Sequence, residues 1–259
     1  MLLALDIGNS AVKGALFDGE TLRQVFHVDV PPPETSGEGR ADRWQQALGA
    51  HLSAVSVDRT GIVSVVPEAV PAAEAALGSL TRGPVVVVDA SMRLPFTLDY
   101  KTPRTLGTDR LAAAAAAWTR YGAPASRSII AIDAGTAVNY EVVDHGGVYR
   151  GGAIGAGPAL TQQALRSGTA QLPTVPLQVP SAAMGTSTRT AMQSGILYGF
   201  IDGVCGMVNR LGDALDDTPC VVLTGGWSAV LADRMPHVDR VEPHLVLDGV
   251  RILLDLNLD

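Results

Sequence analysis

Residues 3–18 read LALDIGNSAVKGALFD. An apolar run ends at Asp6, a Gly-Asn-Ser turn follows, and a second apolar run contains Lys13. Two apolar runs separated by such turn residues predict a strand, a tight turn and a second strand, at 2–6 and 12–17. Lys13 is one of only two lysines, the other being Lys101, in a chain that otherwise uses arginine. A lysine retained inside this hairpin therefore suggests a chemical role.

The same pattern returns near the middle of the chain, where residues 128–144 read SIIAIDAGTAVNYEVVD. Asp6 aligns with Asp133 at an offset of 127 residues (133 minus 6), about half of the chain. That alignment matches Gly8 with Gly135 and Ser10 with Ala137, and it sets Asn9 opposite Thr136. Repetition of the strands together with the turn predicts an internal duplication.

The remaining elements fit two α/β halves of the β-β-β-α-β-α type. The expected elements are a strand at 21–28, helices at 42–54 and 67–80, strands at 61–66 and 84–90, a helix at 108–122, helices beginning at 158 and 188, a strand at 220–226, and a helix near 248–256. We therefore expect two domains, 1–122 and 123–259, with a cleft between them.

Composition limits the possible functions. Of the 259 residues, 47% are hydrophobic and 17% are charged, which is enough for a sizeable core. A net charge of −7 argues against general affinity for nucleic acid, which needs basic surface. Met1 leads directly into a strand-like run, and no apolar run reaches the roughly 18 residues of a membrane span. We expect a cytoplasmic protein with no membrane partner, and we expect Cys205 and Cys220 to be reduced thiols.

The two turns suit a polyphosphate ligand. Glycine frees backbone N–H groups to approach phosphates closely, and an ammonium on a flexible stem can reach a phosphate as a point charge. Lys13 could take that role, with Asp6 and Asp133 placed to hold a cation. Neutral donors would come from Asn9, Ser10 and Thr136. The alternative is a plain hairpin with a solvent-facing lysine.

Four segments carry a family resemblance. DIGNSAVK (6–13) and DAGTA (133–137) resemble the phosphate-gripping pair of the acetate/sugar kinase, Hsp70 and actin superfamily. YKTPRTLGTDR (100–110) resembles the Tyr-x-x-Pro…Gly-x-Asp-Arg segment of type III pantothenate kinases. GGAIGAGPAL (151–160) and GTSTRTAMQSGILYG (185–199) resemble later segments of that family. The resemblance implies two ribonuclease H-like domains of the actin-like ATPase fold.

The resemblance also implies an activity and its residues. The activity is ATP-dependent phosphorylation of pantothenate to 4'-phosphopantothenate, the first step of coenzyme A biosynthesis, by a homodimer that needs Mg²⁺ and a monovalent cation, K⁺ or NH₄⁺. ATP would be held by Asp6, Ile7, Gly8, Asn9, Ser10, Ala11, Val12, Lys13 and Thr136. Pantothenate would be held by Tyr100, Gly107, Thr108, Asp109, Arg110 and Thr188. Asp109 would accept the proton, and Asp133 would ligate the monovalent cation.

Asp109 makes chemical sense as that base. It opens an alanine-rich predicted helix, where the helix dipole favours the ionised carboxylate. A carboxylate in reach can take the proton of a primary alcohol as phosphoryl transfer proceeds. Arg110 could form a fork with the carboxylate of pantothenate. The alternative is a helix-capping aspartate beside a surface arginine, and Tyr100 could be a core or rim aromatic.

Some positions are open or depart from the family pattern. Gly151, Gly152, Gly155 and Gly157 suggest close backbone approach to a ligand, or a plain loop. The segment 224–226 could contact adenosine. Asn139-Tyr140-Glu141 stands where the family commonly has Thr-x-Asp, so cation affinity could shift. Thr186 and Ser187 stand where it has Lys-Asn, so the pantothenate lid could differ.

Two other functions stay open. A catalytically inactive, nucleotide-binding accessory or regulatory protein of the same fold would have no need of Asp109. A kinase of the superfamily acting on a sugar or acetate is disfavoured by the segment 107–110, through resemblance alone. The joint presence of Lys13, Asp109, Arg110 and both carboxylate turns favours the kinase.

Overall fold

The computed structural model describes residues 1–9, 11–31 and 38–258, which form two compact units. Unit 1 comprises Met1–Ala116 and Leu245–Asp259, and unit 2 comprises Ala117–His244. The chain therefore passes into unit 2 a few residues before the expected boundary at 122. Its last segment, expected in the second domain, belongs to unit 1 instead.

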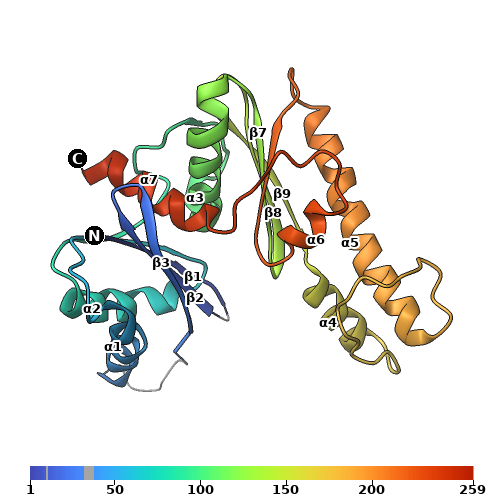
Figure 1. The fold of residues 1–259 in the computed structure, drawn as a ribbon, viewed down its shortest axis with the longest axis horizontal. Helices are drawn as coiled ribbons and strands as arrows, with labels where there is room; N and C mark the ends of the chain where they lie inside the picture. Colours follow the sequence, from blue (N-terminus) through green and yellow to red (C-terminus); the bar gives the residue numbers. More distant parts are fainter. Residues whose placement is uncertain (10, 32–37, 259) are drawn as a thin grey trace. The chain divides into compact units, whose positions relative to one another are not determined.

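Unit 1 is built on a five-stranded sheet of order β3-β2-β1-β4-β5 (Figure 1). The strands are β1 (Leu2–Ile7), β2 (Ala11–Asp18), β3 (Thr21–Asp29), β4 (Arg59–Ser64) and β5 (Val85–Val87). The helices are α1 (Glu38–Leu52), η1 (Pro67–Ala69), α2 (Val70–Leu80), η2 (Pro103–Thr105), α3 (Thr108–Ala117) and α7 (Leu245–Leu258), and β6 is a short strand at Thr97–Leu98. The first three strands are antiparallel neighbours, whereas β1, β4 and β5 run parallel.

Unit 2 repeats this topology, with its strands in the order β9-β8-β7-β10-β11. The strands are β7 (Ile129–Ala134), β8 (Ala137–Val143), β9 (Val148–Ala156), β10 (Cys220–Thr224) and β11 (Arg240–Val241). The helices are η3 (Trp118–Gly122), η4 (Ala123–Ala125), α4 (Pro158–Gly168), α5 (Thr188–Gly212) and α6 (Ser228–Ala232). Strand directions match as well, since β7 is antiparallel to β8 and parallel to β10. The predicted duplication is confirmed.

The two hairpin turns differ in length by one residue. In unit 1 the N–H of Gly8 donates to the carbonyl of Ala11 over 3.0 Å. In unit 2 the N–H of Gly135 donates to the carbonyl of Ala137 over 2.9 Å. Ala11 is thus the counterpart of Ala137, and the expected match of Ser10 with Ala137 is wrong. An ungapped alignment could not detect the shorter turn. Ser10 itself lies outside the described residues.

Alternation along β1 sorts its side chains onto two faces. Leu3, Leu5 and Ile7 belong to the core that unit 1 forms with α1 and α2. On the other face lies α7 (Figure 1). Gly61 of β4 leaves room for this helix. A Cβ at Gly61 would lie 2.4 Å from Leu254 of α7. This packing on β4 explains why the last helix belongs to unit 1.

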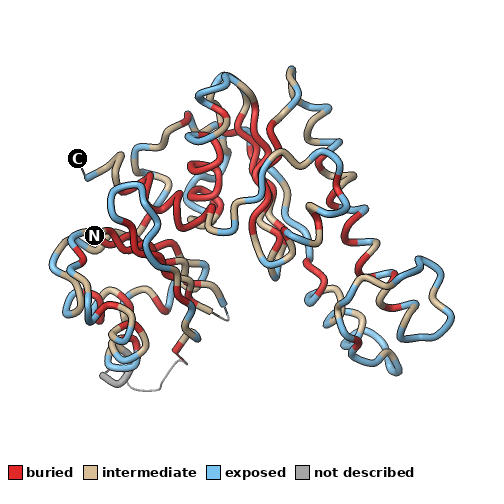
Figure 2. Tube along the Cα trace, in the orientation of Figure 1, coloured by how far each residue is buried: buried red, intermediate tan, exposed pale blue. Residues whose placement is uncertain are grey.

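Two other expectations differ from the structure. The helix expected over 108–122 changes from α-helical to a π-helical turn at Trp118, whose ring packs where Gly122 has no side chain. The duplication implies a third strand in the second half, and β9 is that strand, but its residues were not assigned because its glycines resemble a loop. Figure 2 shows buried strands in both units, whereas most residues of 166–174 are exposed.

Within the described segments, no helix is both long enough and apolar enough to cross a membrane.

Candidate active site

The opening hairpin places Asp6 and Lys13 beside each other. They are register partners in the β1–β2 ladder, so both side chains leave the same face of the sheet. Side chains directly opposite in an antiparallel pair have Cβ atoms about 5 Å apart. Both residues are half-buried, near the end of β1 and the turn. Lys13 therefore lies beside a carboxylate and the turn, and it does not face open solvent.

The start of α3 is fixed to the same edge of the sheet. The backbone N–H of Ser64, the last residue of β4, donates to Oγ1 of Thr108 over 3.0 Å. Ser64 is the register partner of Ile7, next to Asp6, in the parallel β1–β4 pair. The first residues of α3 therefore lie at the carboxyl edge of the sheet in unit 1. This is the edge where ligands bind in parallel α/β sheets.

Asp109 has a buried and unsatisfied oxygen at this edge. Among the described residues its Oδ1 finds no hydrogen-bond partner. Gly107 makes the space for it, since a Cβ there would lie 2.5 Å from that Oδ1. Burial raises the pKa of the Asp109 carboxyl above 3.8, although backbone N–H groups and the charge of Arg110 oppose the rise. A carboxylate with raised pKa and an unused oxygen is suited to accept a proton.

Arg110 is not a surface residue. It is only 8% exposed, and its charge acts on Asp109. Asp109 itself is the second residue of α3, inside the helix rather than before it. The alternative of a capping aspartate beside a surface arginine is therefore wrong.

In unit 2, Asp133 occupies the position in the hairpin that Asp6 occupies in unit 1. The register partner of Asp133 is Asn139 in β8 and Thr224 in β10. Gly225, the next residue, has a φ of +88°, which favours glycine, and a Cβ there would lie 2.5 Å from Oδ1 of Asp133. The segment expected to contact adenosine thus packs directly on the carboxylate that the resemblance assigns to a cation.

The turn of unit 2 is supported by a close backbone contact. The N–H of Gly157 donates to the carbonyl of Thr136 over 2.9 Å, and a Cβ at Gly157 would lie 2.3 Å from the carbonyl of Gly135. Gly152 is likewise pressed against β8, where its Cβ would lie 1.6 Å from the carbonyl of Tyr140. At these two positions the protein's own backbone accounts for the glycine, while Gly155 has open space beside it.

A family model described as type III pantothenate kinase matches residues 2–210. The chain belongs to the type III pantothenate kinase family. A relative of that name from Chlorobaculum parvum is 37% identical over 260 aligned positions, covering 98% of this chain and 94% of the relative.

Solved structures show the fold of this pantothenate kinase family member. A Baf family transcriptional activator from Campylobacter jejuni aligns with a TM-score of 0.60 at 18% identity, covering 98% of this chain and 97% of the other. A ROK family glucokinase from Streptomyces griseus aligns with a TM-score of 0.52 at 16% identity, covering 99% of each chain. The expected two-domain, actin-like ATPase fold with ribonuclease H-like halves is confirmed.

The residues that the pantothenate kinase resemblance assigns to the acceptor fall in different units. Tyr100 and the segment 107–110 lie in unit 1, whereas Thr188 lies in unit 2. Thr188 is the exposed first residue of α5, after a capping box of Ser187 and Thr190. It borders a groove of about 810 Å³ beside α4 and α5. Thr186 and Ser187, the residues that depart from the family pattern, line the same groove.

Glu141, another departure, lies in the interior of unit 2. It is 1% exposed, and its carboxylate accepts a hydrogen bond from the hydroxyl of Tyr149 in β9. A buried carboxylate is stabilised by such a donor. At least one hydrogen bond of the Glu141 carboxylate is therefore made inside unit 2.

Sequence reasoning missed a pocket of about 890 Å³ in unit 1. Its lining residues are Asp89, Ala90, Ser91, Lys101, Thr102, Pro103, Arg104, Thr105, Leu106 and Thr108. Thr108 had been expected in the acceptor site, but the others had not. One signal was available: Lys101 is the second lysine of the chain, and it stands between Tyr100 and the segment 107–110.

Proposed function

We propose that this chain transfers the γ-phosphoryl group of ATP to the primary hydroxyl of pantothenate, giving 4'-phosphopantothenate for coenzyme A biosynthesis. Membership of the type III pantothenate kinase family supports this function. The observation that carries it is the carboxylate of Asp109, whose Oδ1 is buried without a partner among the described residues. An accessory protein that only binds a nucleotide would gain nothing from so costly a group.

The hairpin residues 6–13 and Thr136 are the proposed ATP ligands. Lys13 supplies a positive charge beside the turn, and the carboxylates of Asp6 and Asp133 offer hard oxygen donors that fit Mg²⁺ or K⁺. Groups of three or more metal-binding side chains are absent from the described residues. Magnesium is commonly held by one or two carboxylates and completed by phosphates and water. When bound, Mg²⁺ neutralises charge on the transferring phosphoryl group.

The monovalent cation is assigned to Asp133. The Thr136 hydroxyl and nearby backbone carbonyls are oxygen donors of the kind K⁺ accepts. Acceptor binding is assigned to Tyr100, Thr188 and the segment 107–110, with Asp109 as proton acceptor. As a cytoplasmic enzyme, the protein would meet ATP and pantothenate in the same compartment.

A homodimer is part of the proposal. Helix α5 is 25 residues long, and Gly195, Gly199 and Gly203 recur along it at intervals of four. All three are exposed, and a Cβ added to any of them would meet nothing within 4 Å. Residues four apart lie on one helix face, and small residues there let a second helix approach closely.

One assay tests the function. Purified protein is mixed with ATP, Mg²⁺ and pantothenate, with and without K⁺, and release of ADP is followed. We expect release that depends on pantothenate and that increases with K⁺ or NH₄⁺. Absence of pantothenate-dependent release with every cation would reject the kinase in favour of a nucleotide-binding accessory protein. Release unaffected by monovalent cations would reject only the role of Asp133.

A further inference from the structure

We propose that His27 is a further ligand of the phosphates of ATP and that it acts beside Lys13. This inference rests on the proposed function, because it adds a residue to the nucleotide site assigned to the opening hairpin. His27 lies in β3, outside the segments that carry the family resemblance. The observation that carries the inference is a row of three polar side chains across the sheet of unit 1.

The row crosses β1, β2 and β3 at one level. Lys13 is the register partner of Asp6 in β1 on one side and of His27 in β3 on the other. The β2–β3 register is unbroken from Ala11 to Leu16, so the irregularity of this pair lies beyond the row. Register partners share one face of the sheet, with Cβ atoms about 5 Å apart. His27 therefore stands next to Lys13, on the face that carries Asp6.

Helix α7 packs on the same face of the sheet but further from the hairpin turn. The guanidinium carbon of Arg251 lies 5.9 Å from the centre of the Phe17 ring. Phe17 is near the far end of β2, whereas Lys13 is near the turn. At the level of the row, the side chain of His27 is exposed. A ligand bound at the turn can therefore reach it.

His27 and Lys13 are both available to such a ligand. Within residues 1–9, 11–31 and 38–258, neither side chain forms a hydrogen bond or an ion pair. The neighbouring His51 differs, because its ring stacks on Phe26 with ring centres 4.3 Å apart. An imidazole has an N–H donor in both its neutral and its charged form, and phosphate oxygens accept such bonds. His27 can thus add a directional donor to the point charge of Lys13.

Asp29 gives this surface an opposite charge. It is the next residue of β3 on the same face, and it lies opposite Ala11 at the end of the turn. Asp29 is exposed, and a carboxylate at this position repels a phosphate bound to the turn. Removing Asp29 should therefore have the opposite effect on ATP binding from removing His27. Changes of opposite sign at two neighbouring positions are the signature of a bound anion.

The test compares His27→Ala, His27→Arg and Asp29→Asn with a control, His237→Ala. His237 is an exposed histidine of unit 2 that precedes β11, away from the carboxyl ends of the strands. Calorimetric titration with ATP and Mg²⁺ gives the Kd of each protein. We expect the Kd to rise about five- to tenfold in His27→Ala, as for the loss of a hydrogen bond to a charged group. His27→Arg keeps a donor and should stay within about twofold of the wild type, Asp29→Asn should bind about twofold more tightly, and the control should match the wild type.

Three outcomes would overturn the role of His27. The first is an unchanged Kd for ATP in His27→Ala. The second is weaker binding of ATP by Asp29→Asn, which would mean that no phosphate lies beside β3. The third comes from steady-state kinetics of His27→Ala. An equal rise in the KM for pantothenate and in the KM for ATP would indicate a general disturbance of the site.

The binding measurement also separates this inference from the proposed function. Weaker binding of ATP by His27→Ala supports the role even in a protein that releases no ADP with pantothenate. An unchanged Kd overturns it even in an active kinase.

Discussion

At the scale of single residues, Asp109 combines a catalytic assignment with a structural cost. Its burial raises the pKa of the carboxyl in the folded protein. The folded state then holds the proton more tightly than the unfolded state, so stability falls as pH rises from the unfolded pKa to the folded one. Above the folded pKa, burial of the ionised carboxylate lowers the stability of the folded protein by its full amount. Such a cost in stability is typical of a functional residue.

Replacing Asp109 with Asn should separate the two effects. We expect turnover to fall at least about 100-fold, because no base remains to take the hydroxyl proton. We expect the melting temperature at neutral pH to be unchanged or higher, because the buried charge is gone. Enzyme assays and thermal melts of both proteins measure this. Nucleotide binding should persist, and near-normal turnover would rule out Asp109 as the base.

The pH dependence of the wild type offers a second check on the same residue. Activity should be lost on the acid side as Asp109 becomes protonated, with an apparent pKa above the 3.8 of an ordinary aspartate. A profile of kcat/KM against pH shows this limb.

Sequence reasoning identified these residues but not their surroundings. Asp6 and Lys13 are visible because strand alternation and turn residues are local properties of the sequence, whereas Asp109 is identified through the family resemblance of the segment 100–110. The burial of Arg110 and the pocket beside Lys101 depend on tertiary packing, which leaves no periodic trace. Nothing local marks an exposed lysine as the wall of a pocket.

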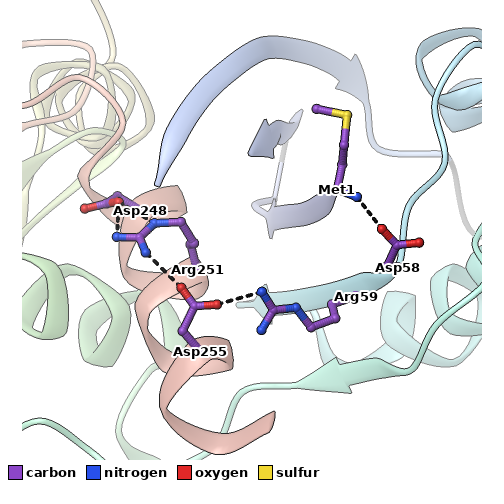
Figure 3. A network of polar contacts seen from close by, with 6 residues as sticks. All are labelled: Met1, Asp58, Arg59, Asp248, Arg251 and Asp255. Atoms are coloured by element: carbon purple, nitrogen blue, oxygen red, sulfur yellow. Dashed lines mark hydrogen bonds and ion pairs between the residues drawn. The ribbon is translucent and has the colours of Figure 1, made fainter. Parts of the chain in front are cut away.

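At the scale of elements, helix α7 carries an ionic network that is buried within the helix and partly exposed where it reaches β4. Arg251 contacts Asp248 at 3.0 Å and Asp255 at 2.9 Å, one on each side along the helix (Figure 3). Asp255 also pairs with Arg59 of β4 at 3.0 Å. Arg251 and Asp248 are buried, whereas Arg59 and Asp255 remain about one-third exposed. The buried salt bridge and the partly exposed one should therefore contribute differently to the free energy of unfolding.

Alanine substitutions should expose that difference. Arg251→Ala leaves the buried carboxylate of Asp248 without this partner, and we expect a loss of about 3 kcal/mol in the free energy of unfolding. Arg59→Ala breaks a partly solvated pair, and we expect a loss below about 1 kcal/mol. Urea denaturation of both variants measures the comparison. Equal losses would contradict the assignment of the network's stability to its buried half.

The sequence predicts that α7 is a helix, but it does not show against which unit this helix packs. Its apolar residues predict burial, while the choice between units depends on Gly61, which leaves space for Leu254. The third strand of the second half was implied by the duplication, but its residues, those of β9, were not assigned because they are rich in glycine. Glycine has low strand propensity, and at Gly152 the close approach of Tyr140 overrides it.

At the scale of the whole molecule, duplication accounts for the design of the chain. Both units repeat one strand order and one hairpin, and both place a carboxylate on the strand before the turn. The copies have since diverged in their polar residues. Lys13 faces Asp6 in unit 1, whereas Asn139 faces Asp133 in unit 2. The positive charge of Lys13 favours phosphate, and the neutral amide of Asn139 tolerates a cation. The two hairpin sites therefore suit different ligands.

The exposed glycines of α5 make the proposed homodimer testable. Gly199 lies in the middle of the three, and an arginine there would add a long charged side chain to a face that needs close approach. In sedimentation velocity we expect the wild type at twice 26.9 kDa and Gly199→Arg at the mass of one chain.

Gly199→Ala is the matched control for that experiment. Alanine is nearly as small as glycine and is the better helix former by about 1 kcal/mol, so this variant should remain dimeric and melt at a higher temperature. A wild type that sediments as a monomer would remove the dimer from the proposal. If Gly199→Arg stayed dimeric, the association would have to use a surface other than this face of α5.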